Sequence, residues 1–248
     1  MGYVFDFKNA RDFHRWSRKP RAQLLIDLET RLMHDMLMPH RTETVLDIGC
    51  GAGLTLDHLI RHGLDVTGAD PSVYMLDYAK QRLGSRADLY QCPAENLPFE
   101  DNAFNHAIFM TSLEFTEDPR KALAEACRVA KDRLFIGTLN RYALKNIYRR
   151  MYGVFGQTVY NRAKFFSIWE LKQMIRGLLG NIPITWRTTC QLPTVADGWR
   201  LSLERSAWIQ RCPLGAFVGM VVTLEPQFKT RPLPLSIHSK PAAKTVAG

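Results

Sequence analysis

The residues best suited to chemistry are an acid and three closely spaced glycines in the stretch VLDIGCGAG, which begins at Val45. Asp47 ends a short apolar run, which is typical of a buried parallel strand that stops at its carboxyl end. Gly49, Gly51 and Gly53 let the chain turn sharply and bring bare backbone close to a ligand. The pattern therefore predicts a small-molecule cradle, in which the Cys50 side chain would pack rather than react.

A second acid, Asp70, ends the run GLDVTGAD one strand–helix unit later. An acid at the tip of that strand is well placed to accept hydrogen bonds from both hydroxyls of a ribose. Because Pro71 follows, the alternative is that Asp70 only caps a helix. Both roles are open on the sequence.

The elements that must position these residues alternate between short apolar runs and amphipathic ones from Thr44 to Leu139. This alternation is typical of βαβ units around a parallel sheet. We predict strands at 44–49, 64–70, 87–92, 104–110 and 133–139, and a helix at 116–130 that begins at Pro119 under a cap from Thr116 or Asp118. The predicted fold class is α/β, a Rossmann-like, doubly wound and mostly parallel seven-stranded sheet with helices on both faces.

The rest of the chain divides into a lid, a cap and a tail. Residues 1–43 are predicted to form an N-terminal helical lid, helical in its second half, across the entrance of the sheet. Within the core at 44–227, an aromatic and basic cap occupies about 140–166. After the cap we predict helices at 167–179 and near 201–211, and strands at 181–192 and 215–224. Residues 228–248 contain four cations and no acid, which predicts a flexible basic tail.

Composition narrows the class of protein further. The 248 residues carry a net charge of +9, and no apolar stretch approaches the roughly 20 residues that span a bilayer. The N-terminus lacks the apolar core of a signal peptide, so we predict a cytoplasmic protein. Five cysteines without a CxxC pair favour reduced thiols over disulfides or a zinc site, and no metal is predicted.

The acid and glycine pattern DxGxGxG resembles the class I S-adenosylmethionine-dependent methyltransferases, in particular the small-molecule branch that includes quinone-biosynthesis enzymes. The resemblance continues through AENLPFEDNAFNHAIFMTSLEF and DPRKALAEACRVAKDRLFIGTLN, and so covers about 44–140. It implies that S-adenosylmethionine is the cofactor and that Asp47 orders the glycine loop and the methionine moiety. It also implies that Asp70 binds the ribose, that Ala94 and Glu95 lie beside adenine and that Thr111 flanks the methionine part. The glycines 49, 51 and 53, with Cys50 and Pro71, complete the predicted cofactor-binding set.

Two departures bear on the cofactor. The family often has an acid just before Ala94, where this chain has Cys92 and Pro93, so adenine must be held by the Ala94 amide and by packing. The dinucleotide fingerprint GxGxxG requires glycine at position 54, where this chain has Leu54, which argues against an NAD-dependent enzyme.

The methyl acceptor is less specified by the sequence. The stretch from Met110 to Leu113 lacks the Pro-Pro-aromatic motif of enzymes that methylate base amines, so nucleic acid is an unlikely acceptor and a small molecule is favoured. Methyl transfer by in-line displacement depends mainly on positioning, and an acceptor that needs a base would have weak candidates only. Those candidates, each more often structural, are His14, Glu114, Tyr142 and Tyr160.

Aromatic and basic residues alternate in the cap, where most of the aromatic rings would simply pack it onto the sheet. As a site, the cap would suit an apolar molecule with an anionic group. The basic clusters at 8–21 and 141–164 are solvated faces, or contact an anionic substrate, an acidic lipid surface or RNA. The alternatives to a small-molecule methyltransferase are a non-catalytic binding or interaction protein of the same fold and, more distantly, an RNA methyltransferase. Nothing in the sequence indicates the oligomeric state.

Overall fold

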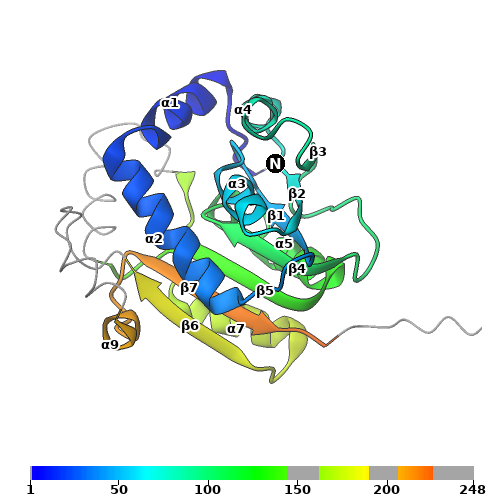
Figure 1. The fold of residues 1–248 in the computed structure, drawn as a ribbon. Coiled ribbons are helices and arrows are strands. Elements are labelled where there is room, and N and C mark those ends of the chain that lie inside the picture. Colours follow the sequence, from blue (N-terminus) through cyan, green and yellow to red (C-terminus); the bar gives the residue numbers. More distant parts are fainter. Residues whose placement is uncertain (1, 144–161, 190–205, 226–248) are drawn as a thin grey trace, which may run out of the picture.

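The computed structural model describes residues 2–143, 162–189 and 206–225, and within them lies one seven-stranded sheet (Figure 1). The strand order is β3-β2-β1-β4-β5-β7-β6, in which β7 runs antiparallel to β5 and β6 and the other neighbouring strands pair in parallel. The strands are β1 (Thr44–Ile48), β2 (Asp65–Ala69), β3 (Asp88–Tyr90), β4 (Phe104–Met110), β5 (Ala130–Leu139), β6 (Ile184–Thr189) and β7 (Phe217–Thr223). The predicted fold class is confirmed, and each strand lies within its predicted range or extends it slightly.

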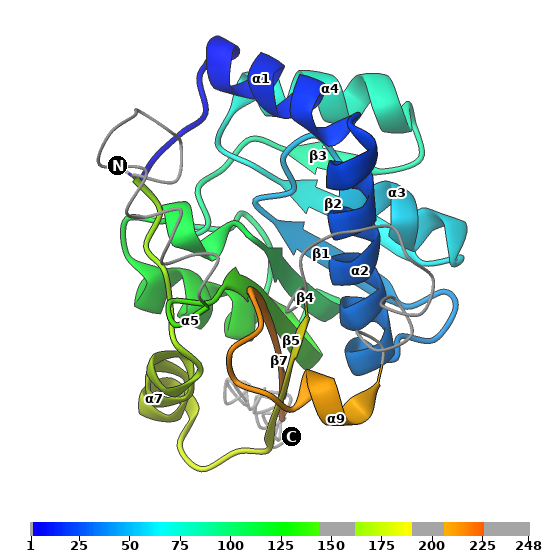
Figure 2. The ribbon, with the colours of Figure 1, turned by 90° about the vertical axis from the view of Figure 1, so that its left-hand side faces the viewer.

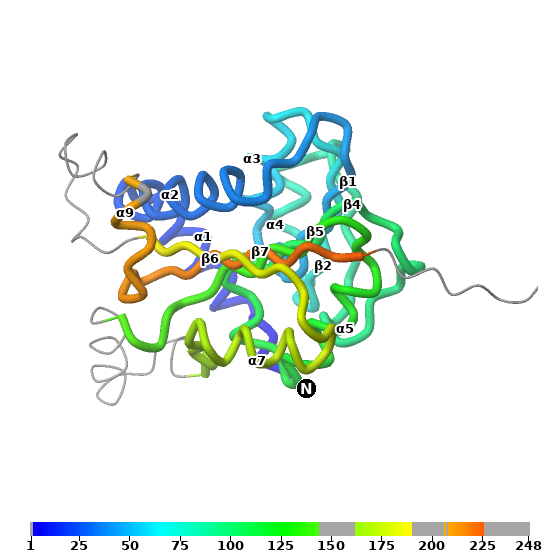
Figure 3. Tube along the Cα trace, turned by 90° about the horizontal axis from the view of Figure 1, so that it is seen from below, coloured from blue at the N-terminus to red at the C-terminus, as the bar shows by residue number. Residues whose placement is uncertain are grey.

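Helices cover both faces of the sheet, as Figure 3 shows from below. One layer contains α2 (Pro20–Leu37), α3 (Leu54–Arg61) and the short α9 (Ala207–Gln210), and the other contains α5 (Pro119–Val129) and α7 (Ile168–Leu179). Further helices are α1 (Phe7–Ser17), α4 (Val73–Leu83) and the 3-10 turn η1 (Leu113–Phe115). Each layer has its own apolar core, one built around Leu32 and Leu56 and the other around Leu123 and Leu171.

The parallel register of β1 and β2 brings the two predicted acids to the same edge of the sheet. Asp47 pairs with Gly68, and Ile48 pairs with Ala69 at the carboxyl ends of the two strands. The loop that starts at Gly49 and the loop that starts at Asp70 therefore leave the sheet side by side.

Side-chain caps decide where the helices begin. The Ser72 hydroxyl accepts a hydrogen bond from the Met75 amide and caps α4, so the alternative that Asp70 serves only as a cap is wrong. Asp118, rather than Thr116, caps α5, and Pro119 begins that helix. The predicted capping box at the start of α7 is present.

The N-terminal region contains one more helix than the sequence predicted. Helicity was expected only in the second half, whereas α1 precedes α2 and begins at an Asp6 cap. The helix α2 packs on β5, β6 and β7, and α1 packs on α4. The extended residues 2–6, here called the N-terminal strap, pass on the side toward which β1, β2 and β3 point (Figure 2).

Some predictions fall outside the described residues. Of the predicted cap, residues 140–143 and 162–166 are described, and the remainder is not, nor is the predicted tail at 228–248. The predicted helix near 201–211 is described only from Ser206, and α9 occupies four residues of it. The cysteines in the described ranges are free thiols, and Cys190 lies outside them. No described helix combines the length and apolarity needed to cross a bilayer.

Candidate functional site

The glycine loop between β1 and α3 folds back on the end of β2. The amides of Gly49 and Cys50 both donate hydrogen bonds to the Ala69 carbonyl, at 2.7 and 3.0 Å. At Gly51, where φ is +52°, the position of an added Cβ has nothing within 4 Å, so the bare backbone faces open space. Gly53 differs, because an added Cβ would lie 2.9 Å from Leu83. One glycine leaves room for a ligand, and the other lets two helices pack.

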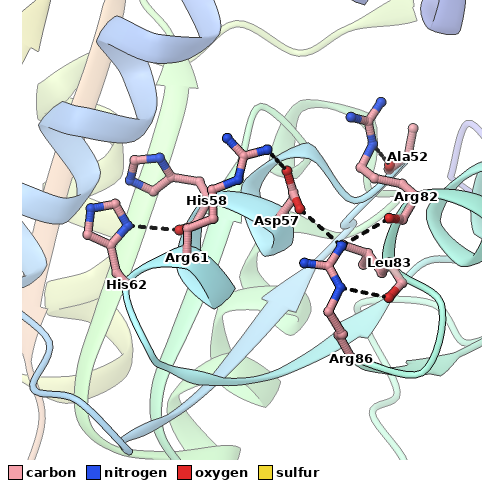
Figure 4. A network of polar contacts seen from close by, with 8 residues as sticks. All are labelled: Ala52, Asp57, His58, Arg61, His62, Arg82, Leu83 and Arg86. Carbon is pink, nitrogen blue, oxygen red and sulfur yellow. Dashed lines mark hydrogen bonds and ion pairs between the residues drawn. The ribbon is translucent and has the colours of Figure 1, made fainter.

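An ionic network supports the loop from the side of α4 (Figure 4). The Arg82 guanidinium donates a hydrogen bond to the Ala52 carbonyl at 3.0 Å. Asp57, on the first turn of α3, forms ion pairs with Arg61 and with Arg86, the latter at 3.3 Å. These residues were not predicted from the sequence, since charges spaced along two helices resemble ordinary surface pairs.

Asp70 locks the loop to the end of β2. Its Oδ2 accepts a hydrogen bond from the Gly51 amide at 2.9 Å, and its Oδ1 accepts one from the Ser72 amide at 2.8 Å. Burial raises the pKa of Asp70 to about 6, and these two hydrogen bonds oppose the rise. A carboxylate oxygen has two lone pairs, so each oxygen retains the capacity to accept a ligand hydroxyl.

Asp47 lies under the loop rather than in the wall of the cavity. Its side chain is 1% exposed, and neither carboxyl oxygen has a hydrogen-bond partner within the described part of the chain. Burial first, and then the nearby charge of Asp70, raise the pKa of Asp47 to about 8. An ionised Asp47 is therefore poorly stabilised unless a ligand brings a positively charged group next to the glycine loop.

The segment after β3 forms a second wall. Cys92, Pro93, Ala94 and Glu95 all line the cavity, and Gln91, which was not predicted, lines it too. The Glu95 carboxylate already accepts hydrogen bonds from the amides of residues 117 and 118, at 2.8 and 3.2 Å. It therefore holds the turn before α5 in addition to lining the cavity.

The segment after β4 forms a third wall, through Met110, Thr111 and Ser112. Thr111 adopts a φ of +52°, which is uncommon for a β-branched residue. Its amide donates a hydrogen bond to the Gly137 carbonyl at 2.8 Å, which holds this conformation in place. Backbone strain of this kind tends to occur at functional sites.

These walls enclose a cavity of about 950 Å³ that continues under the lid. The part beyond the three loops is largely apolar, and its walls include Tyr3, Phe5, Phe13, Trp16, Ile26 and Glu29. The charged side chains among the described lining residues are all acidic: Asp12, Glu29, Asp70 and Glu95. No lysine, arginine or histidine belongs to that described lining.

None of the four predicted base candidates belongs to the described lining. The His14 ring stacks on Tyr78 with ring centroids 4.4 Å apart, and Tyr142 is 49% exposed with its ring against Trp169. Tyr160 lies outside the described residues.

Glu114 is buried behind the cavity wall. Its Oε1 accepts a hydrogen bond from the Leu139 amide at 2.7 Å, and Oε2 has no hydrogen-bond partner among the residues that the structure describes. Burial raises its pKa to about 8. Glu29, which does line the cavity, was missed, because on the sequence it is one acid among several on an amphipathic helix.

Comparison with known proteins finds a family match for part of the chain, from β1 into β5. Residues 46–135 match the family model described as "Methyltransferase domain". An uncharacterised methyltransferase of Mycobacterium bovis is 34% identical over 97 residues, which are 39% of each chain. A ubiquinone biosynthesis O-methyltransferase of Coxiella burnetii is 36% identical over 105 residues, covering 39% of this chain and 44% of that one. The match thus spans about two fifths of the length of these curated relatives.

The resemblance of fold extends over more of the chain. A crystallised methyltransferase of Thermotoga maritima, described as SAM-dependent, superposes with a TM-score of 0.67 at 24% identity. The alignment covers 88% of this chain and 96% of that one, so the likeness of fold extends well beyond residues 46–135.

Proposed function

The chain carries a class I S-adenosylmethionine-dependent methyltransferase domain, and from that premise we propose that it transfers a methyl group from S-adenosylmethionine to a small, largely apolar molecule. The predicted family and its cofactor are confirmed by the domain match. The observation that carries the proposal is the hydrogen bond from the Gly51 amide to Asp70, which fixes a buried carboxylate beside an open cradle.

The described residues fit the cofactor. Gly51 leaves the space that a side chain would fill, and Asp70 keeps acceptor capacity for the ribose hydroxyls. Ala94 and Glu95 line the wall where adenine is expected, and Thr111 lines the wall where the methionine part is expected. A cationic group above the loop would also favour the ionised form of Asp47, which the free protein disfavours.

The chain itself contributes positioning and exclusion of water. When bound, S-adenosylmethionine supplies an electrophilic methyl group. The side chains of the strap, α1 and α2 cover part of the cavity with aromatic and aliphatic surface, which limits the access of water and would confine an acceptor against the loops. None of the predicted bases belongs to the described lining, but the carboxylates of Asp12 and Glu29 do. An acceptor that is already nucleophilic would need neither, and an acceptor that must lose a proton would have these two carboxylates beside it.

The acceptor is proposed as apolar from the same lining. The predicted anionic group has no cationic partner among the described lining residues, although the guanidinium of Arg162 lies 4.8 Å from the ring centroid of Tyr3, which does line the cavity. The cytoplasmic location and the low affinity for nucleic acid stay predictions.

The test is a calorimetric titration with S-adenosylhomocysteine, coupled to tritiated-methyl transfer onto a panel of apolar amines, phenols and thiols. Asp70→Asn is expected to weaken binding by about 100-fold, because it removes a charged acceptor for two hydroxyls. Asp65→Asn is the matched control, since Asp65 is exposed at the opposite end of the same strand. Equal affinity of both variants would overturn the proposed cofactor site. Binding without turnover on any acceptor would favour the non-catalytic alternative.

A further inference from the structure

The outer face of α1 concentrates positive charge. From Phe7 to Arg21 the chain contains six lysines and arginines and a single acid, Asp12. At 100° per residue, Lys8, Arg11 and Arg15 fall within one third of the helix circumference, together with Phe7. Lys8 and Arg15 are exposed, and exposed Arg18 and Lys19 continue the charge at the turn into α2.

Exposed apolar side chains border these cations. Phe7 is 56% exposed, and its ring packs edge-on against Tyr74 with centroids 5.8 Å apart. Tyr74 is 42% exposed, Val73 46% and Val4 40%. The Arg11 guanidinium lies 5.9 Å from the centroid of the Phe7 ring. Exposed apolar side chains gathered at one place and rimmed by polar groups are typical of surfaces that bind a protein or a membrane.

The same helix forms part of the cavity wall. Phe13 and Trp16 line the cavity from the other side of α1, while Val4 and Asp12 both line the cavity and are exposed. The mouth of the cavity is therefore next to the charged face, at the strap and the first turns of α1. A molecule leaving the cavity at Val4 would emerge among the exposed apolar side chains.

We propose that this face docks on an anionic lipid surface. The N-terminal basic face is defined here as Val4, Phe7, Lys8, Arg11, Arg15, Arg18, Lys19, Val73 and Tyr74. Lysines and arginines near an anionic bilayer are attracted to its headgroups, and aromatic and aliphatic side chains enter the boundary between headgroups and acyl chains. Three exposed acids border the face among the described residues, namely Asp6, Asp12 and Asp77, the last of which lies one helical turn after Val73 and Tyr74 on α4. Asp12 lies 3.7 Å from Arg11.

A lipid surface agrees with the face better than RNA does. Phe7 and Tyr74 would offer rings to RNA bases, but the other exposed apolar residues, Val4 and Val73, are aliphatic and suit the boundary of a bilayer better than a base. The cavity behind the face is lined by apolar side chains, which suits a molecule delivered from a membrane. This docking would present the mouth of the cavity to the bilayer, and it does not depend on methyl transfer.

The experiment is co-sedimentation of the full chain with vesicles of phosphatidylcholine alone or mixed with phosphatidylglycerol. The triple variant Lys8→Glu/Arg15→Glu/Lys19→Glu is expected to lose at least about 100-fold in partitioning onto the anionic vesicles, since each cation near the surface contributes to attraction. Its matched control is Arg120→Glu/Lys121→Glu/Arg176→Glu, which changes the net charge equally on exposed positions of α5 and α7. The control is expected to lose about 10-fold or less.

Phe7→Ser separates apolar insertion from charge. It is expected to weaken partitioning by about 5-fold while leaving the salt dependence intact. Equal losses in the two triple variants would overturn the proposal, and would point to total charge or to the cations near the C-terminus. Equal binding to neutral vesicles, or tighter binding to a single-stranded RNA oligonucleotide, would overturn it as well. Circular dichroism and S-adenosylhomocysteine binding establish that each variant is folded. If the triple variant of the N-terminal basic face is not folded, the double variant Phe7→Ser/Lys8→Ala replaces it.

Discussion

The floor and the lid of the cavity are held in different ways. The floor consists of the loops after β1, β2, β3 and β4, which are fixed by backbone hydrogen bonds, glycines and buried carboxyls. The lid, residues 2–37, is held mainly by side-chain packing and by a few contacts such as the hydrogen bond from the Tyr3 amide to the Phe115 carbonyl at 2.8 Å. Substitutions in the floor are therefore expected to disturb its structure, whereas the amino-acid sequence of the lid can vary with the acceptor.

The largest expected effect is that of Gly49→Ala in the floor. An added Cβ would lie 2.3 Å from the Ser112 Cβ, and the φ of +76° is unfavourable for alanine. We expect a loss of at least about 3 kcal/mol in the free energy of unfolding, measured by urea denaturation. Gly84→Ala is the control, since its φ is +61° but an added Cβ meets nothing within 4 Å, and about 1–2 kcal/mol of strain is expected there. Equal losses in the two variants would mean that the loop has room to shift.

The second-largest effect is expected for Asp47→Asn, which tests whether a residue of the floor favours ligand binding while it destabilises the free protein. The folded-state pKa of Asp47 is raised from 3.8 to about 8, so the folded protein binds more protons than the unfolded chain between these values, and stability falls as pH rises through them. Asp47→Asn removes this loss and is expected to stabilise the free protein at pH 9 by more than about 1 kcal/mol. The same variant should bind S-adenosylhomocysteine more weakly.

The raised pKa of Glu114, about 8, contributes a slope of the same sign, so Glu114→Gln serves as the comparison variant. It should also flatten the pH dependence of stability, but without the loss of ligand affinity. A destabilised Asp47→Asn protein at pH 9 would contradict the assignment of a poorly solvated carboxyl beneath the glycine loop.

A smaller effect is expected in the lid. Phe5→Ala removes a ring that packs edge-on against Phe115 at 5.3 Å and lines the cavity. We expect S-adenosylhomocysteine to dissociate about 3- to 10-fold faster in stopped-flow measurements, because the strap covers the cavity less tightly. Phe7→Ala, on the outer side of α1, should leave the dissociation rate unchanged. If both variants dissociate alike, the strap does not retain the ligand.

The smallest effect concerns the contact of α2 with α3. Burial, and then the neighbouring His62 and His34, lower the pKa of His58 from 6.5 to about 4. The neutral form is therefore favoured in the folded protein, and stability is lost as pH falls from about 6.5 toward 4. His58→Gln should reduce this loss in thermal denaturation, and His40→Gln, at an exposed position, should not. If His58→Gln loses as much thermal stability at acidic pH as the wild-type protein does, another group is responsible for that loss.

The sequence predicted the floor better than the lid for a physical reason. Asp47, the glycines and Asp70 follow strands whose ends coincide once a parallel sheet is assumed, so their proximity follows from the fold class. The separate roles of Gly51 and Gly53 did not follow, because they depend on what the missing side chains would touch.

The lid residues could not be located from the sequence, because their packing is tertiary. Trp16 and Glu29 are unremarkable members of amphipathic helices until α1 and α2 are placed over the sheet. His14 and Glu114 were predicted as candidate bases from residue type alone. In the fold, the His14 ring stacks on Tyr78 of α4, and the Glu114 side chain is buried behind the cavity wall. Arg82 and Asp57 were missed for the same reason, since their partners lie in other elements.

The most direct test of the division between floor and lid is hydrogen–deuterium exchange with and without S-adenosylhomocysteine. The account predicts slower exchange in peptides that cover residues 49–54, 70–72 and 91–95, a smaller slowing in the strap, and no change in α7. Unchanged exchange in the glycine loop at a saturating ligand concentration, or protection concentrated in α7, would contradict the assignment of the floor as the cofactor site.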